Sequence, residues 1–196
     1  HKILPQDLKV TFFDVGQGDA ALIQTPKGET ILIDGGGFLI PGKPHPFDVG
    51  KEVVFPYLKR AGVERIDLMI LSHPHPDHYG GLEAIVDSMP VTEFWWNGQG
   101  FPDETFTRLM TRLAERDVLM KKVAAGDRID RDGIRIEVLY PTAVFPKLGI
   151  NNNCLVVRLA YGETGFLFAG DIEKEAEAKV ALLPALQSAV LKIPHH

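Results

Sequence analysis

The chain has a single cysteine, no hydrophobic run as long as a membrane span, and no excess of basic residues. One cysteine excludes an internal disulfide, and the apolar run around Cys154 predicts a buried thiol in a strand. No stretch approaches the roughly 20 apolar residues that cross a bilayer, and the start of the chain lacks the apolar centre of a signal peptide. A formal net charge of −5 argues against a broad basic surface for nucleic acid.

The composition is that of a globular domain. The chain has 196 residues, of which 45% are hydrophobic and 24% charged, enough to form a substantial core. No repeat, linker or low-complexity segment divides it. Because the chain stops directly after an apolar run, we expect residues 1–196 to be one domain of a longer protein, cut at its C-terminal end.

Strand-like segments outnumber helical ones. Strands are expected at residues 8–15, 20–25, 30–34, 66–71, 91–96, 118–123, 134–140, 153–161, 165–170 and 189–193. Helices are expected at residues 49–63 (kinked or broken at Pro56), 80–89, 103–118 and 173–183. Helices between groups of strands predict an α/β (α+β) fold with two sheets and helices outside them.

Directly after the strand at residues 66–71, the segment SHPHPDHYGG contains four potential metal ligands: His73, His75, Asp77 and His78. Imidazole and carboxylate groups are strong ligands for divalent metals. The two prolines between these residues favour extended backbone and argue against a helix. In such a stiff loop the first two histidines can share one ion, while the aspartate and the third histidine reach a second.

A second histidine cluster supports this interpretation. Five of the seven histidines fall at residues 73–78 and 195–196, and each cluster follows an apolar strand. The alternative is that they are surface-loop histidines with no shared task. Their common position at strand ends favours a two-metal site.

The motif resembles the His-x-His-x-Asp-His motif of the metallo-β-lactamase superfamily. Further landmarks follow in order, LIDGG at Asp34, FLFAGDIE at Asp171 and LKIPHH at the end. The resemblance extends from about residue 8 to the last residue and implies a four-layer αββα sandwich with metals at one edge. FFDVGQGDAALIQ, GINNNCLVVRL and VLKIPHH are similar to the nuclease-like domain of the ComEC family of bacterial competence DNA-uptake proteins.

This resemblance implies two divalent ions and the ligands His73, His75, Asp77, His78, Asp171 and His195. The first two histidines would bind one ion, Asp77 and His78 the other, and Asp171 both. His195 would complete the second site, and His196 is either the alternative ligand or a group that contacts the scissile phosphate. Asp77 would also orient the nucleophile.

Asp34 is expected to hold the motif loop through hydrogen bonds rather than to touch metal. Many superfamily members have another histidine before the bridging aspartate, but none occurs here from Tyr79 to Pro194. Asn152 or Asn153 falls near that place, which predicts a first site that favours Mn²⁺ over Zn²⁺, although Zn²⁺ also suits the set. The alternative is that the asparagines form only a turn before a strand.

Other residues carry weaker signals. Asp14 and Asp19, in the turn DVGQGD, either bind or support the metals or simply form the turn. Arg108 and Arg112 lie on one helix face and are candidates for phosphate contacts, although charge on a helix face is commonly just solvated. At least one of the adjacent tryptophans, at positions 95 and 96, is expected to be structural.

The ComEC resemblance implies a metal-dependent nuclease that degrades one DNA strand while the other enters the cell. The domain would work at the extracytoplasmic face of the membrane, joined to the channel portion of the same polypeptide. One alternative is a hydrolase of another phosphodiester, similar to phosphorylcholine esterases. The other is a domain that binds DNA or a partner subunit without catalysis.

Overall fold

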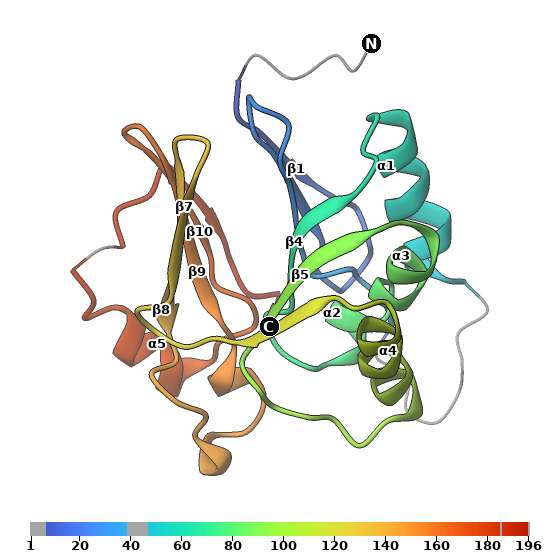
Figure 1. Cartoon of the computed structure of the whole chain (residues 1–196). Helices are drawn as coiled ribbons and strands as arrows, with labels where there is room; N and C mark the ends of the chain where they lie inside the picture. The colour runs from blue at the N-terminus through green and yellow to red at the C-terminus, as the bar shows by residue number, and fades with distance from the viewer. Residues whose placement is uncertain (1–6, 39–46, 185, 196) are drawn as a thin grey trace.

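Two β-sheets pack face to face, with helices on the outer side of each (Figure 1). This computed structural model describes residues 7–38, 47–184 and 186–195. Within these ranges, none of the helices combines the length and apolar character needed to cross a membrane.

The first sheet has the strand order β1-β2-β3-β4-β5-β6. Its strands are β1 (Lys9–Phe12), β2 (Ala21–Gln24), β3 (Thr30–Ile33), β4 (Ile66–Ile70), β5 (Val91–Trp96) and β6 (Leu119–Lys122). The first three strands are antiparallel neighbours, and β3 to β6 run parallel. The carboxyl ends of these parallel strands meet at one edge, where α/β proteins commonly place their ligands.

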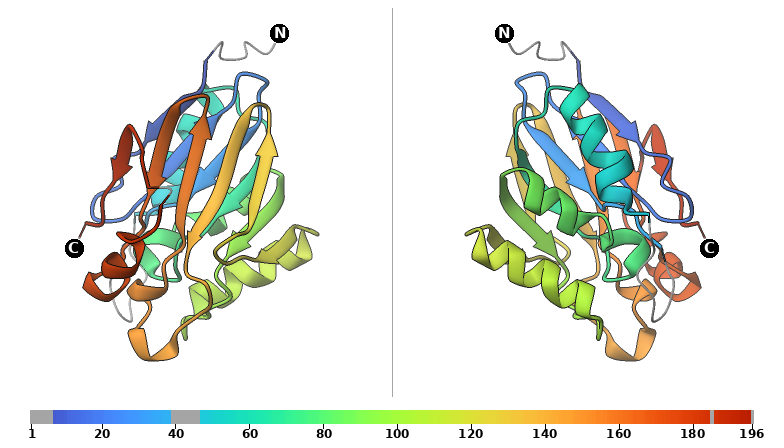
Figure 2. Two further views of the ribbon diagram at one scale, coloured as in Figure 1. Left: turned by 90° about the vertical axis from the view of Figure 1, so that its left-hand side faces the viewer. Right: turned by 90° about the vertical axis from the view of Figure 1, so that its right-hand side faces the viewer.

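The helices of this half cover the outer face of the first sheet, as the right-hand view of Figure 2 shows. They are the π-helical turn η1 (Gly50–Val54), α1 (Phe55–Arg60), α2 (Pro76–Tyr79), α3 (Leu82–Ser88) and α4 (Glu104–Glu115). The expected helix over residues 49–63 is thus divided between η1 and α1. Pro56 stands in the first turn of α1, where a missing N–H is tolerated.

The second sheet has the order β11-β10-β9-β8-β7. Its elements are β7 (Arg128–Arg131), β8 (Ile134–Tyr140), η2 (Pro146–Leu148), η3 (Asn151–Asn153), β9 (Val156–Tyr161), β10 (Thr164–Phe168), α5 (Lys174–Val180) and β11 (Val190–Lys192). Only the pair β10–β11 is parallel. In the left-hand view of Figure 2, α5 covers only the lower part of this sheet.

Three separate clusters of buried side chains define the layers. One lies between the first sheet and its helices, one between the two sheets, and one beneath α5. Along β3, Leu32 belongs to the helix-side cluster, whereas Ile31 and Ile33 belong to the cluster between the sheets. This alternation, which follows from the pleat of a strand, gives each sheet two apolar faces. The expected four-layer αββα sandwich is therefore confirmed.

Both tryptophans of β5 are structural. Trp95 is fully buried between the sheets, and Trp96, 9% exposed, faces the helices. Neither is placed to stack on a nucleic-acid base.

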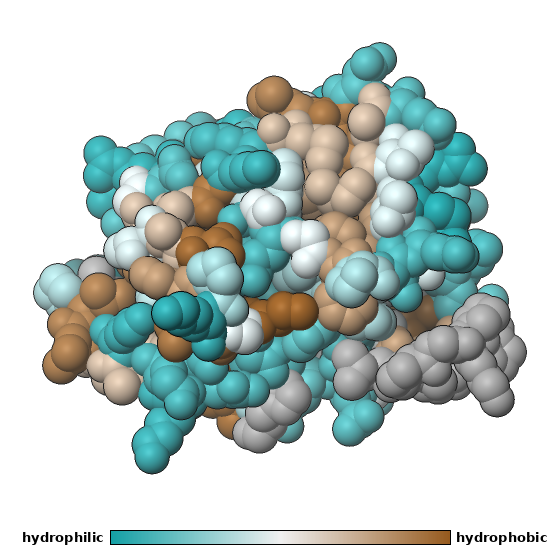
Figure 3. Space-filling view, turned by 90° about the horizontal axis from the view of Figure 1, so that it is seen from below, coloured by the Kyte–Doolittle hydropathy of each residue, from teal (hydrophilic) through white to brown (hydrophobic). Residues whose placement is uncertain are grey.

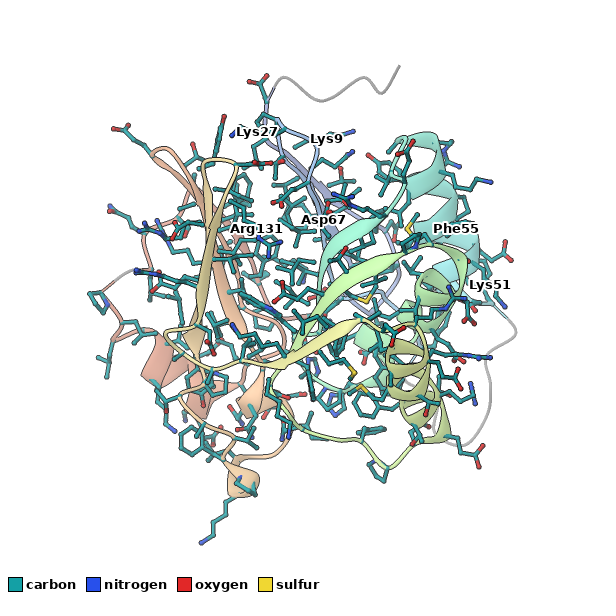
Figure 4. All side chains as sticks on the ribbon, viewed as in Figure 1. Lys9, Lys27, Lys51, Phe55, Asp67 and Arg131 are labelled. Atoms are coloured by element: carbon teal, nitrogen blue, oxygen red, sulfur yellow. The ribbon has the colours of Figure 1, made fainter. Side chains whose placement is uncertain are left out.

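The strand β7 was not expected from the sequence, because three of its four residues are charged. Its Arg131 is only partly buried, and its side chain lies 3.1 Å from Glu93 on β5 and 3.7 Å from Glu29. Figure 4 shows this side chain reaching from β7 toward the first sheet. The ion pairs link the two sheets.

The expectation that the histidine motif is entirely non-helical is wrong. Pro76 begins α2, because proline in the first turn lacks only an N–H that would have no helical partner. His75 before it is extended, with φ −98° and ψ 146°, as the bias of a residue preceding proline predicts. Asp77 and His78 therefore project from a helical turn rather than from an extended loop.

Close backbone contacts hold α2 in place. A Cβ on Gly18 would collide with the backbone carbonyl oxygen of Asp77. The N–H of Gly35 donates to the carbonyl of His78 at 2.7 Å, and the N–H of Gly36 donates to that of Asp19 at 2.8 Å. The glycine motifs after β1 and β3 thus let the main chain approach the histidine motif.

This contact predicts that Gly18→Ala destabilises the fold by about 1–3 kcal/mol, because the new methyl group has only rigid backbone beside it. Chemical denaturation measures the loss. Gly100→Ala is the matched control, since its Cβ would meet open space. Equal stability of the two variants would contradict the packing described here.

Candidate metal centre

Six expected ligands come from both sheets to one edge of the sandwich. His73 and His75 follow β4, Asp77 and His78 lie on α2, Asp171 stands between β10 and α5, and His195 follows β11. Seen from this side, the surface is mostly hydrophilic, with hydrophobic residues in smaller patches (Figure 3).

Asp171 is the centre of the group. Its Oδ2 lies 3.2 Å from His78 Nε2, 3.1 Å from His195 Nε2 and 3.9 Å from His73 Nε2. The residue is completely buried. Gly170 precedes it with a left-handed φ of 55°, a conformation suited to glycine. This turn brings the Asp171 N–H to 3.3 Å from the sulfur of buried Cys154.

Two more contacts complete the donor set. His73 Nε2 and His75 Nδ1 face each other at 3.0 Å, and Asp77 Oδ2 lies 3.4 Å from His195 Nε2. Within the described part of the chain, Asp77 Oδ1 is buried without a hydrogen-bond partner. A buried carboxylate oxygen is costly unless a cation or donor compensates it. The converging nitrogen atoms and this oxygen fit divalent metal.

One part of the group is particularly compact. Asp19, His78, Asp171 and His195 each offer a ligand atom, and these atoms lie within 4.8 Å of one another. Imidazole and carboxylate together suit Zn²⁺ and Mn²⁺. This is a candidate metal site built from four separate segments of the chain.

Asp34 orients the motif through hydrogen bonds. Its Oδ1 accepts from the Ser72 N–H at 2.7 Å, and its Oδ2 accepts from the Ser72 hydroxyl at 2.7 Å and lies 2.9 Å from His78 Nδ1. Contact at Nδ1 leaves Nε2 of His78 directed at the centre, the arrangement found behind metal-binding histidines. Ser72 was not singled out in the sequence, although it opens the SHPHPDH motif.

Neighbouring charges dominate the electrostatics of the site. Burial lowers the pKa of His78, but the carboxylates of Asp34 and Asp171 outweigh it and raise the pKa to about 10. Burial also raises the pKa of Asp19, partly offset by the ammonium of Lys192 at 2.6 Å. Two carboxylates that stabilise a proton on His78 would likewise stabilise a metal ion at its Nε2. Lys192 was also overlooked in the sequence, within LKIPHH.

Asn152 and Asn153 hold a loop and a helix. The amide oxygen of Asn152 accepts from the Ala176 N–H of α5 at 3.0 Å, and that of Asn153 accepts from the Phe145 N–H at 2.6 Å. Both amide groups donate to carbonyls of the preceding loop, including Leu148 and Gly149. These bonds describe the turn that was the alternative to metal binding, and a ligand role stays a prediction.

Among the described residues, the remaining candidates show no hydrogen bond or ion pair with this centre. Asp14 is exposed, and His196 lies outside the described residues. Arg108 contacts Glu83 at 3.1 Å, and Arg112 lies 2.9 Å from Glu115 and 3.6 Å from Asp87. Both arginines are therefore paired with acidic residues on α3 and α4. A phosphate-binding role for Arg108 and Arg112 stays a prediction.

The chain is similar to a known protein family and to several curated proteins. The model of the family described as the metallo-beta-lactamase superfamily matches residues 13–192. ComE operon protein 3 of Bacillus subtilis (strain 168) is 32% identical over 202 residues, which cover 98% of this chain and 26% of that protein. Competence protein ComA of Neisseria gonorrhoeae is 28% identical over 189 residues, covering 95% and 23%. The chain thus spans about a quarter of the length of these curated relatives.

Solved structures show the same fold. MEM-A1, a subclass B3 metallo-beta-lactamase isolated from a soil metagenome library, aligns with a TM-score of 0.59 and 18% identity. The alignment covers 98% of this chain and 80% of that one. At this level of identity the likeness concerns the fold alone.

The hydrogen bonds of Asp34 predict that Asp34→Asn weakens Mn²⁺ and Zn²⁺ binding by about 10–100-fold, because an amide cannot accept at both former oxygens. Competition with a chromophoric chelator measures the affinity. Asp67→Asn is the matched control. Asp67 is also buried, and it accepts hydrogen bonds from the Thr30 N–H and hydroxyl. It lies at the other end of β4 (Figure 4). Equal metal affinities of the two variants would contradict the role given to Asp34.

Proposed function

The chain belongs to the metallo-β-lactamase superfamily, and we propose that it is a metal-dependent phosphodiesterase that hydrolyses DNA. The observation that carries this proposal is the convergence of three histidines on the buried Asp171 carboxylate at one edge of the sandwich. Similarity to competence proteins over nearly the whole chain supports DNA as the substrate.

The donor set would hold two divalent ions. His73, His75 and Asp171 would hold the first, and Asp77, His78 and His195, again with Asp171, the second. Bound divalent ions supply Lewis-acid chemistry, which lowers the pKa of water and neutralises charge on phosphoryl oxygens. We favour Mn²⁺ over Zn²⁺, because only two imidazoles serve the first ion and oxygen ligands suit the harder metal.

The protein's own groups position the reactants. Asp77 Oδ1 is buried and has an open acceptor position among the described residues, so it can accept a hydrogen bond from the attacking water and direct it in line with the leaving oxygen. Asp34 and Ser72 hold His78 in orientation. The paired histidines of the motif leave two roles for His196, contact with the scissile phosphate or replacement of His195 as the metal ligand.

The relatives and the ComEC resemblance support a biological setting for this proposal. The domain would degrade one strand during natural-transformation DNA uptake while the other enters the cell. It would work at the extracytoplasmic face of the bacterial membrane, as part of a longer polypeptide that contains the channel. The chain's share of about a quarter of its relatives' length is consistent with one domain of such a protein.

We expect metal-stripped protein to be inactive and Mn²⁺ to restore cleavage of linear single- or double-stranded DNA. Asp77→Ala should lower the rate about 10²–10⁴-fold, because the water loses its positioning group. Gel assays with Mn²⁺, Zn²⁺ and Mg²⁺ measure both effects, and Asp67→Asn serves as a buried-aspartate control. No cleavage by folded, metal-loaded protein would overturn the nuclease proposal.

The same assays distinguish the other candidate functions. Hydrolysis of bis-p-nitrophenyl phosphate without cleavage of DNA would indicate a hydrolase of another phosphodiester. A non-catalytic DNA-binding domain would retain function in Asp77→Ala and lose affinity in Arg112→Ala. We expect Arg112→Ala to keep its affinity for DNA, because the Arg112 guanidinium is already paired with acidic residues.

A further inference from the structure

A lysine stands at the edge of the candidate metal centre. Lys192 is the last residue of β11, and its Nζ lies 2.6 Å from Asp19 Oδ1. Asp19 is one of the four residues whose ligand atoms cluster within 4.8 Å. The Asp19 side chain is 11% exposed and the Lys192 side chain 28% exposed. The ammonium therefore lies between a buried carboxylate of the site and solvent.

Three arginines that could otherwise meet an anionic substrate are paired with acids elsewhere. Arg108 and Arg112 pair with acids on α3 and α4, and Arg131 pairs with two glutamates. Among the described residues, Lys192 is the one lysine or arginine with an ion pair to a member of the four-residue cluster. In a chain with a net charge of −5, this positive charge is well placed to counter repulsion of a phosphate.

The surroundings of the pair strengthen its electrostatic interactions. Lys192 and Asp19 line one hollow together with the apolar side chains of Phe12 and Phe168. A charge beside apolar groups interacts more strongly than one in water, because the local dielectric constant is lower. Lysine binds phosphate oxygens as a point charge and needs no fixed plane of donors.

We propose that Lys192 binds a non-bridging phosphate oxygen of the substrate at the metal centre, exchanging its contact with Asp19 for one with the phosphodiester. Asp19 and the carbonyl of Ile193, to which the ammonium donates at 2.8 Å, hold it in position while no substrate is bound. This inference rests on the proposed phosphodiesterase function, which it deepens by naming the group that recognises the phosphate. The competing role for Lys192 is neutralisation of Asp19 alone.

The test uses a single-stranded oligonucleotide with a 5′-fluorescein label and phosphorothioate linkages. Its binding to Mn²⁺-loaded protein is measured by fluorescence anisotropy at several salt concentrations. We expect Lys192→Gln to raise the Kd about tenfold. The slope of log Kd against log salt should fall by about 0.7, the value for one phosphate contact on a single strand. Lys192→Arg should retain most of the affinity.

The double variant Asp19→Asn/Lys192→Gln separates the two roles. It removes both charges, so it restores the charge balance without restoring a cation for the phosphate. If Lys192 binds phosphate, the double variant, measured at saturating Mn²⁺, stays as weak as Lys192→Gln. Wild-type affinity of the double variant, or of Lys192→Gln, overturns the inference.

Failure of this inference is distinguishable from failure of the proposed function. If the wild type cleaves unmodified DNA but Lys192→Gln binds the oligonucleotide normally, only the role of Lys192 is wrong. If the wild type binds through Lys192 but cleaves no DNA with any metal, the nuclease proposal fails and the phosphate contact stands. No binding by the wild type overturns the contact.

Discussion

Removing a carboxylate from water costs several kcal/mol unless cations or donors surround it, and the fold must meet this cost at Asp171. The residue is fully buried, and three imidazoles from β4, α2 and the end of β11 approach the same oxygen. Such convergence requires both sheets to end at one edge. The sandwich therefore does more than bury apolar side chains, because its register determines whether the histidines meet around one carboxylate.

The glycine motifs around the site serve backbone packing rather than metal binding. Gly18 leaves space for the carbonyl of Asp77, and the N–H of Gly35 donates to the carbonyl of His78. These contacts fix α2 between the turn after β1 and the segment after β3. Asp34 then sets the orientation of His78. Residues that touch no metal thus determine where the donor atoms point.

Much of this arrangement could be predicted from the sequence. Alternating apolar strands with helices between them gave two sheets, and the histidine clusters at strand ends indicated a metal edge. Other features depend on partners far along the chain. Two of the acids that pair with Arg108 and Arg112 lie on α3. The acid that pairs with Arg131 of β7 lies on β5, in the other sheet. The helix at Pro76 was missed because proline breaks helix interiors yet favours their first turn.

The most direct measurement is the anomalous diffraction of crystals soaked in Mn²⁺. If Asp171 bridges two ions, we expect two peaks about 3.5–4 Å apart, one on each side of its carboxylate. One should lie beside His73 and His75, and the other beside His78 and His195. A single peak, or peaks that leave Asp171 without a metal contact, would contradict the two-metal centre.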